Sequence, residues 1–543
     1  MAVRTRKSTA RTSPKRRAER PRPTTGRTRV PSRPSQGSAS SPSANPSGTG
    51  NLWTPEADEI GIRVRMYRVG FGDFFLVTLL DDSGNAHHII IDCGVFKGTS
   101  QTGDIGSIEA AVADMVETTG GHVALVIMTH RHADHIAGFA RCVDTFKKLT
   151  VGAVWMPIWE SEYEPTALRF QVELTRTALA LRKHFTALGA NVSEEYNTAR
   201  KYMENATGEF DAAGAAAKGS NAVALDLLKH GFAGITPRYY HAGDKTDLPQ
   251  ELVNAGLSSQ VLGPPPVADI DLMKLMDLQK GVGQYLTGDG GENAGHFEPF
   301  GAEWVVDPEQ PPVKDQTDFY HPETFREWVS GRQRKSWGPV TREDARRARK
   351  SLERALQQLQ PIAALTAAKT LNAFLNNQSL VVLFTFKSKK LLFVGDAQAG
   401  NWEHWVFATD TPDKKASGTI DPPARQILTS LDLYKVGHHG SGNATPKAVA
   451  EMMGTSGRPF VALCSTEANV YGTEDPDDPT KGTEVPRGPL LDKLASESAL
   501  VRSDQIAITV NGKQIQAAVP ATLPDPPRGV RLVLGPIWVD AYL

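Results

Sequence analysis

Residues 62–67 alternate between apolar and charged or polar side chains, the pattern of a strand with one buried face. Two further apolar runs cover residues 74–80 and 88–92, and the polar segment 81–85 between them is typical of a turn. Because the three runs are short and closely spaced, they predict a β-meander.

Strands and helices alternate along the rest of the chain. A helix is predicted over 106–119, and apolar runs at 123–128 and 151–156 predict strands. Residues from about 160–232 and 267–370 lack this rhythm and are interpreted as two helical insertions. Later strands are predicted at 238–240, 259–262, 379–386, 390–394, 431–436, 459–464 and 505–510. This order predicts the α/β fold class.

Charge is distributed unevenly along the 543 residues. Residues 1–50 carry twelve Arg and Lys side chains and one acidic side chain, although the whole chain has a net charge of −1. Residues 1–52 have almost no aliphatic content, so they are predicted to form a disordered basic tail ahead of a domain spanning 53–543. Such a tail either solubilises the protein or contacts a polyanion such as nucleic acid.

Several protein classes are excluded by composition. No apolar run approaches the roughly 18–20 residues that cross a bilayer, and no apolar segment follows the N-terminal charges as in a secretory signal. Three scattered cysteines are too few for a disulfide framework or a cysteine-based zinc site. The expectation is therefore a cytoplasmic protein without a membrane segment.

The strongest chemical signal is the string His130-x-His132-x-Asp134-His135, which directly follows an apolar strand. A loop at a strand end can turn His130 and His132 toward one cation, and Asp134 and His135 toward a neighbouring one. Imidazoles and a carboxylate suit zinc, manganese or iron. Two such ions activate water for hydrolysis. One or two Zn²⁺ ions are expected, and Mn²⁺ would also suit the ligands.

Through residues 130–135 the chain resembles the metallo-β-lactamase fold superfamily. Five further stretches make it similar to the soluble hydrolase domain of ComEC-type competence proteins: 72–76 with 90–94, 242–244 with 261–265, 376–383, 392–397 and 435–441. The resemblance covers roughly residues 62–160, 236–266 and 372–515. It implies a four-layer αββα sandwich into which the two helical insertions are built.

The resemblance also implies a centre with six metal ligands, His130, His132, Asp134, His135, Asp396 and His438. His130 and His132 would hold the first ion, and Asp134 and His135 the second. Asp396 would bridge the two ions, and His438 would complete the second site.

Asp134 and His439 are the implied catalytic residues. His439 is the other candidate for the ligand role of His438, because adjacent residues at a strand end tend to point in opposite directions and only one should touch metal. The remaining histidine would bond the substrate or donate a proton to the leaving group. Behind the ligands, Asp92 would orient a histidine, and Asn377 and Ser379 would brace the loops.

One position departs from the family pattern. The ComEC-type pattern has a third histidine for the first metal where this chain has Gly263. The first site is therefore expected to bind more weakly or to hold water in its place. His241, His296 and His321 are the alternative sources of an imidazole.

The resemblance, the basic tail and a basic helix together favour phosphodiesters as substrates and a nuclease or phosphodiesterase function, with nucleic acid as a partner contacted through the tail. Four basic residues of a predicted helix, Arg346, Arg347, Arg349 and Lys350, are candidates for nucleic-acid contact. Acidic residues interleave with them, so a solvated helix face is the alternative. Two other functions stay open: hydrolysis of a lactone, cyclic nucleotide or similar ester, and a non-catalytic nucleic-acid- or protein-binding module with a structural metal.

Overall fold

The computed structural model describes residues 53–96, 106–187, 194–207, 220–273, 275, 361–407, 420–474, 477, 482–504, 508–510, 513–515 and 523–543. The chain divides into two units, Met1–Pro46 and Ser47–Leu543, and every described residue belongs to the second. The predicted basic tail and Arg346, Arg347, Arg349 and Lys350 lie outside the described residues.

The first sheet has eight strands in the order β15-β16-β1-β2-β3-β4-β5-β6. Their bounds are β1 Ile62–Tyr67, β2 Phe74–Leu80, β3 Ala86–Cys93, β4 His122–Ile127, β5 Thr150–Pro157, β6 Arg238–Tyr240, β15 Arg531–Leu534 and β16 Trp538–Tyr542. β1 to β3 pair antiparallel, which confirms the predicted meander, and β4 to β6 continue parallel to β3. The strand β16 pairs with β1, an arrangement that the sequence pattern did not predict.

The second sheet has six strands in the order β12-β11-β10-β9-β8-β7. They are β7 Leu257–Gly263, β8 Val381–Phe386, β9 Lys389–Phe393, β10 Leu433–Lys435, β11 Phe460–Cys464 and β12 Ser498–Arg502. β7 to β9 pair antiparallel, and β10 to β12 continue parallel to β9. Both sheets are therefore mixed and contain the same order of pairings. A short hairpin, β13 Ile508–Val510 with β14 Lys513–Ile515, stands apart from them.

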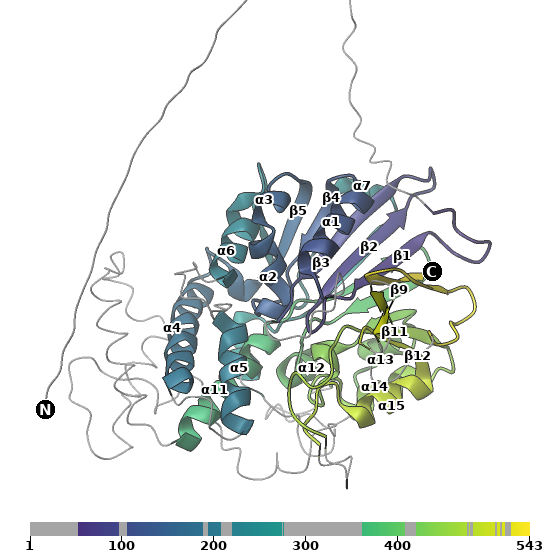
Figure 1. Ribbon diagram of the computed structural model, residues 1–543. Coiled ribbons are helices and arrows are strands. Elements are labelled where there is room, and N and C mark those ends of the chain that lie inside the picture. Colours follow the sequence, from purple (N-terminus) through teal and green to yellow (C-terminus); the bar gives the residue numbers. More distant parts are fainter. Residues whose placement is uncertain are drawn as a thin grey trace, which may run out of the picture. The chain divides into compact units, whose positions relative to one another are not determined.

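The two sheets pack face to face. Their facing side chains form one apolar core, in which Phe75 of β2 meets Phe393 of β9 with ring centroids 5.9 Å apart. Helices cover both outer faces: α1 Ile108–Thr119, α2 Ala133–Arg141 and α3 Val143–Phe146 lie on the first sheet, and α12 Ala399–Trp405, α13 Pro422–Leu428, α14 Lys447–Gly454 and α15 Gly488–Glu497 on the second (Figure 1). The protein is thus an α/β sandwich, because each sheet is apolar on both faces and needs cover on both.

A group of helices packs beside the sandwich around Trp159, Phe170 and Phe374. It contains α4 Pro165–Ala187, α5 Glu194–Thr207, α8 Ile270–Met273 and α11 Pro361–Asn377, while α6 Ser220–Asp226 packs on α2 (Figure 1). The remaining short helices are η1 Ile158–Glu160, η2 Leu227–Gly231, α7 Gln250–Asn254, η3 Val267–Asp269 and η6 Gly437–Gly440. The helical character predicted for the first insertion is confirmed over its described residues, and only the two ends of the second insertion are described.

Within the described residues, no helix is both long enough and apolar enough to cross a membrane.

Candidate metal centre

The predicted metal ligands come from three loops at strand ends. β4 ends at Ile127, and the following loop carries His130 to His132, the residue that precedes α2. Asp134 and His135 lie in the first turn of α2. Asp396 follows β9, and the histidine pair follows β10, which pairs parallel to β9. Because parallel strands place their carboxyl ends at one edge of a sheet, loops far apart in sequence meet there.

Four side chains form a buried cluster, which we call the quartet: Asp134, His135, Asp396 and His439. His135 Nε2 lies 3.1 Å from Asp396 Oδ1. His439 Nε2 lies 3.3 Å from Asp134 Oδ2 and 3.6 Å from Asp396 Oδ2. Each side chain is at most 2 % exposed. Two imidazoles and two carboxylates thus converge at one point inside the protein.

Hydrogen bonds behind the quartet fix which nitrogen of each ring carries its proton. His135 Nδ1 donates to Asp92 Oδ2 at 2.8 Å, and His439 Nδ1 donates to the carbonyl oxygen of Ser465 at 2.8 Å. Neither a carboxylate nor a carbonyl can donate, so both rings are protonated at Nδ1 and present Nε2 to the centre. The predicted contact of Asp92 with a histidine of the cluster is therefore present.

The backbone explains how Asp92 reaches this position. The register of β2 and β3 shifts at Phe75, so Asp92 is the extra residue of a bulge, and its φ is 55°. A bulge re-aims a side chain that would otherwise follow the alternation of the strand. Asp92 also accepts from the backbone nitrogen and hydroxyl of Thr129, at 2.7 and 2.6 Å.

The atoms that face one another in the quartet fit a divalent cation. Within the described residues, no hydrogen bond reaches His135 Nε2, His439 Nε2 or either carboxylate oxygen of Asp396. Buried acceptors facing each other are unfavourable unless positive charge lies between them. Imidazole nitrogens and carboxylate oxygens are the ligands of Zn²⁺ and similar ions.

The shifted pKa values of the histidines also reflect the negative charge of the buried carboxylates. Burial is the largest single influence and lowers the pKa of a histidine, but Asp396, Asp73 and the other nearby carboxylates together outweigh it and raise the pKa of His135 and His439. For His130 and His132 burial prevails and lowers the pKa, to about 4 for His132. The field of the carboxylates is therefore concentrated on the quartet, and the two earlier histidines remain neutral.

The paired histidines do not point in opposite directions as predicted. His438 and His439 both have left-handed backbone angles, with φ of 43° and 53°. The Nε2 atoms lie 3.9 and 3.6 Å from Asp396 Oδ2, so both rings face the same carboxylate. Alternation holds only for extended residues, and two successive left-handed residues turn both side chains to one side. Only His439 joins the quartet.

Ser379 and Asn377 contact the loops of the centre. Ser379 Oγ accepts from the backbone nitrogen of Asp396 at 2.9 Å and lies 3.4 Å from His130 Nδ1. Asn377 donates to the carbonyl oxygens of Met273 and Leu275. Ser379 therefore braces the segment that carries Asp396, whereas Asn377 holds residues 273 and 275 at the end of α8.

A buried ion pair lies beside the quartet and was not predicted from the sequence. The ammonium group of Lys435 contacts the Asp73 carboxylate, donates to the carbonyl oxygen of Gly395 at 2.8 Å and lies 3.5 Å from Asp396 Oδ1. Burial alone would lower the pKa of Lys435, but Asp73 and Asp396 raise it, so the lysine stays charged. The signal was available, since both residues lie within stretches that carry the family resemblance but interrupt apolar runs.

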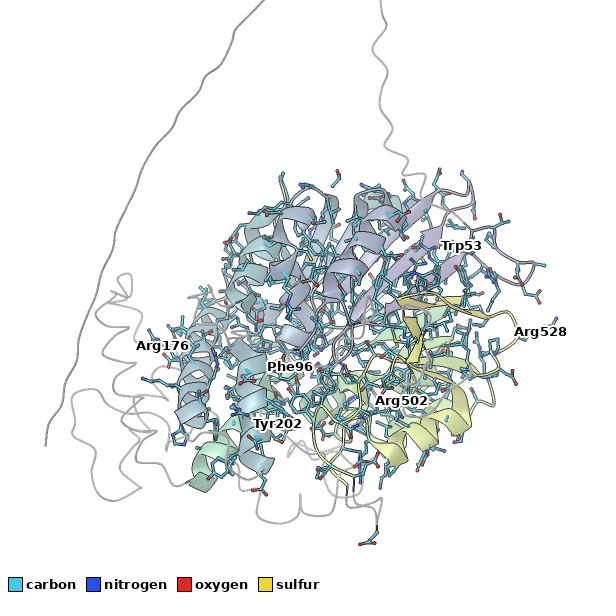
Figure 2. All side chains as sticks on the ribbon, in the orientation of Figure 1. Trp53, Phe96, Arg176, Tyr202, Arg502 and Arg528 are labelled. Atoms are coloured by element: carbon cyan, nitrogen blue, oxygen red, sulfur yellow. The ribbon has the colours of Figure 1, made fainter. Side chains whose placement is uncertain are left out.

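An aromatic group also borders the quartet. Phe71 packs on His439 with ring centroids 4.2 Å apart and on Tyr471 at 5.2 Å. Phe96, in the loop that follows β3, and Tyr202 of α5, both labelled in Figure 2, each have a ring centroid 5.5 Å from that of Tyr471. These rings exclude water from one side of the cluster.

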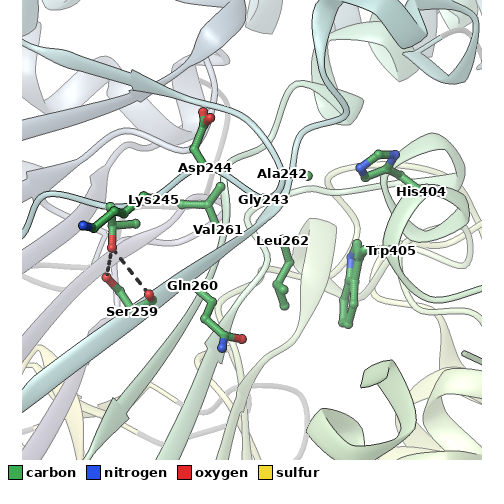
Figure 3. A pocket seen from close by; sticks show the side chains of 11 residues that line it. Ala242, Gly243, Asp244, Lys245, Ser259, Gln260, Val261, Leu262, His404 and Trp405 are labelled. Carbon is green, nitrogen blue, oxygen red and sulfur yellow. Dashed lines mark hydrogen bonds between the residues drawn. The ribbon is translucent and has the colours of Figure 1, made fainter. Parts of the chain in front are cut away.

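A cavity of about 470 Å³ lies elsewhere, beside β7 and α12 (Figure 3). It is lined by polar side chains such as Thr246 and Ser259, whose hydroxyls are 2.8 Å apart, and by Trp405. None of the clustered histidines or aspartates lines it.

Among known proteins, no family model matches the chain, and no curated protein matches it.

Proposed function

We propose that the protein is a metal-dependent hydrolase of the metallo-β-lactamase fold that cleaves phosphodiesters, acting as a nuclease or phosphodiesterase. The observation that carries the proposal is the quartet, in which buried imidazole nitrogens and carboxylate oxygens face one another without a donor between them. The α/β sandwich and the sequence resemblance support the same reading.

Asp134, His135, Asp396 and His439 would hold the cation in this proposal. A divalent ion bound there would supply Lewis-acid activation of a water molecule for attack. We assign the ligand role to His439 rather than to His438, the reverse of the first assignment from the sequence, because His439 lies within the quartet.

Other groups of the chain would orient the ligand rings, and one carboxylate would accept a proton. Asp92 and the Ser465 carbonyl keep the rings of His135 and His439 oriented. Asp134 has one oxygen at His439 and a second, Oδ1, without a hydrogen-bond partner in the described part of the chain. That oxygen is the candidate to accept a proton from the attacking water.

Two amides supply neutral donors beside the centre. Gln398 Nε2 lies 3.0 Å from His438 Nδ1, and Asn376 Nδ2 lies 3.3 Å from His438 Nε2. Both amides border the His438 ring rather than the quartet itself. The sequence resemblance to DNA-degrading proteins selects phosphodiesters among the esters that such a centre could cleave.

A second candidate is the hydrolysis of a small cyclic nucleotide, lactone or similar ester. One observation favours it: the His438 side chain is 16 % exposed, whereas the quartet side chains are at most 2 % exposed. A centre this buried is more easily reached by a small ester than by a duplex.

Hydrolysis assays of the full chain with Zn²⁺ or Mn²⁺ would separate these functions. Single-stranded DNA, a cyclic dinucleotide and a lactone would be offered to the wild type, to Asp134→Asn and to the control Asp244→Asn, whose carboxyl group lies outside the cluster. The proposal expects metal-dependent release of nucleotides that Asp134→Asn abolishes and Asp244→Asn leaves unchanged. Turnover of the lactone alone would favour the second candidate. Bound metal without turnover of any substrate would favour a binding module and refute the enzymatic proposal.

A further inference from the structure

The imidazoles of His130 and His132 form a pair beside the quartet. His130 Nε2 lies 3.0 Å from His132 Nδ1. The single hydroxyl proton of Thr129 goes to Asp92, so Thr129 accepts from His130 Nδ1 at 3.2 Å and leaves His130 Nε2 without a proton. Two nitrogens that ligate one zinc ion at about 2.1 Å are roughly 3.0–3.5 Å apart. The pair has this spacing, and Asp134 forms a buried cluster with it, but Asp134 also belongs to the quartet, so a separate site needs further ligands.

Position 263 cannot supply the next imidazole. A Cβ on Gly263 would lie 1.8 Å from Asn401 Oδ1. Asn401 is held there, because its Nδ2 donates to the carbonyl oxygen of Ser379 at 2.9 Å. His241, the described alternative source of an imidazole, is engaged elsewhere, because its Nε2 lies 3.5 Å from Asp244 Oδ1.

His438 lies beside the same carboxylate that His130 faces. Its left-handed backbone brings Nε2 to 3.9 Å from Asp396 Oδ2. His130 Nε2 lies at the same distance, 3.9 Å, from the same oxygen. His438 Nδ1 lies 3.3 Å from Asn443 Oδ1, an acceptor that draws the ring proton to Nδ1 and leaves Nε2 bare.

Two amides border His438, and both can accommodate a ring that is protonated at Nδ1 and binds a cation through Nε2. Asn376 Nδ2 lies 3.3 Å from Nε2, and its Oδ1 has no hydrogen-bond partner in the described part of the chain, so this amide can turn away when an ion binds. Gln398 lies 3.0 Å from Nδ1, and the oxygen and nitrogen of an amide occupy nearly the same shape, so its unpartnered Oε1 can accept the Nδ1 proton.

The charges around the rings set the expected order of filling. The proposed site draws on three rings, those of His130, His132 and His438. These three imidazoles are neutral donors, whereas the quartet contributes two carboxylates. A cation should therefore occupy the quartet first.

We propose that His438 takes the place of the side chain missing at position 263 and, with His130, His132 and Asp396, completes a second and weaker cation site. This inference rests on the proposed function. It makes His438 a ligand of the cation that His130 and His132 hold. Neither the position of His438 in the sequence nor the pattern at position 263 indicates this role.

Zinc stoichiometry and affinity would test the inference directly. The full chain would be loaded with Zn²⁺ alone, and bound zinc would be counted by mass spectrometry and titrated by calorimetry. The test variant is His438→Gly, which removes the ring and suits a φ of 43°, so folding is preserved. The matched control is His439→Gly, the same change at the neighbouring left-handed residue.

We expect two zinc ions in the wild type. In His438→Gly the weaker site should lose at least about 100-fold in affinity while the tighter site is unchanged. His439→Gly should weaken the tighter site instead. The double variant His130→Ala/His438→Gly should still bind one ion, because both changed residues serve the same site.

Two zinc ions of unchanged affinity in His438→Gly would overturn the inference, even if turnover falls, since the ring would then contact substrate only. A single ion in the wild type would also overturn it and leave the proposed function standing. A wild type that binds no zinc would refute the proposed function itself.

Discussion

Replacement of Asp92 by Asn should uncouple the cluster from the strand behind it. Three donors converge on this carboxylate: His135 Nδ1 at 2.8 Å, and the hydroxyl and backbone nitrogen of Thr129 at 2.6 and 2.7 Å. Asparagine has nearly the same shape and tolerates a left-handed backbone, so the change tests charge and hydrogen bonding rather than packing or strain.

The expected loss in the free energy of unfolding follows from the number of hydrogen-bond acceptors that asparagine keeps. The two contacts at Oδ2 can be kept by the amide oxygen of asparagine, but its NH₂ group then faces the backbone N–H of Thr129. One charge-assisted hydrogen bond is lost, worth about 1.5–3 kcal/mol, and buried donors are left unpaired at about 1–3 kcal/mol. The free energy of unfolding should therefore fall by about 2.5–6 kcal/mol in Asp92→Asn.

Urea denaturation followed by circular dichroism would measure the loss, and zinc titration would measure its effect on the centre. Because His135 loses the partner that orients it, zinc affinity should drop by about 10- to 100-fold. The control is Asp82→Asn, whose side chain is 94 % exposed and which should change stability by less than about 0.5 kcal/mol. If Asp92→Asn unfolds like the control and binds zinc like the wild type, the orienting role of Asp92 is refuted.

Three further predictions address packing, pH and metal. Gly263→Ala should cost about 1–3 kcal/mol of stability in thermal melts because its Cβ meets Asn401, and the added change Asn401→Gly should recover part of that loss; equal melting of single and double variants would contradict the contact. Glu251 holds His87 and His122, whose pKa values it raises, while its own pKa falls to about 2. The stabilisation that the charged histidines contribute is fully present below pH 6.5 and is lost as the pH rises through their raised pKa values. The stabilisation that the ionised Glu251 contributes is fully present above pH 4.5 and is lost as the pH falls toward about 2. Glu251→Gln should therefore destabilise by about 1 kcal/mol near pH 5.5 and by less near pH 8, since the groups are half-buried and screened; an effect that does not vary with pH would argue against this pairing. Removal of zinc by EDTA should lower stability by about 2.7 kcal/mol relative to protein in a hundredfold excess over Kd, and an unchanged melting temperature would count against the centre.

The local pattern determined the strands and the kind of chemistry. Alternation over residues 62–67 and the apolar runs that follow predicted the meander, because burial of one face leaves a period of two in the chain. The string at 130–135 predicted metal-ligating residue types at a strand end, and Asp92 was recognised as the acidic residue behind them. The C-terminal strands of the first sheet were not found, because which strand completes a sheet edge depends on partners far away in sequence.

Tertiary structure alone decided how the candidates divide between sites. Successive left-handed residues turn His438 and His439 toward one carboxylate, against the alternation that strand geometry would impose. Asn401 fills the space beside Gly263, and Lys435 lies beside Asp396, and both contacts join residues that are far apart in the sequence. Side-chain periodicity records which face of an element is buried, whereas the meeting of loops from different strands is set by packing between sheets. A metal centre built from such loops is therefore visible in sequence as residue types and becomes a set of ligands only in the folded chain.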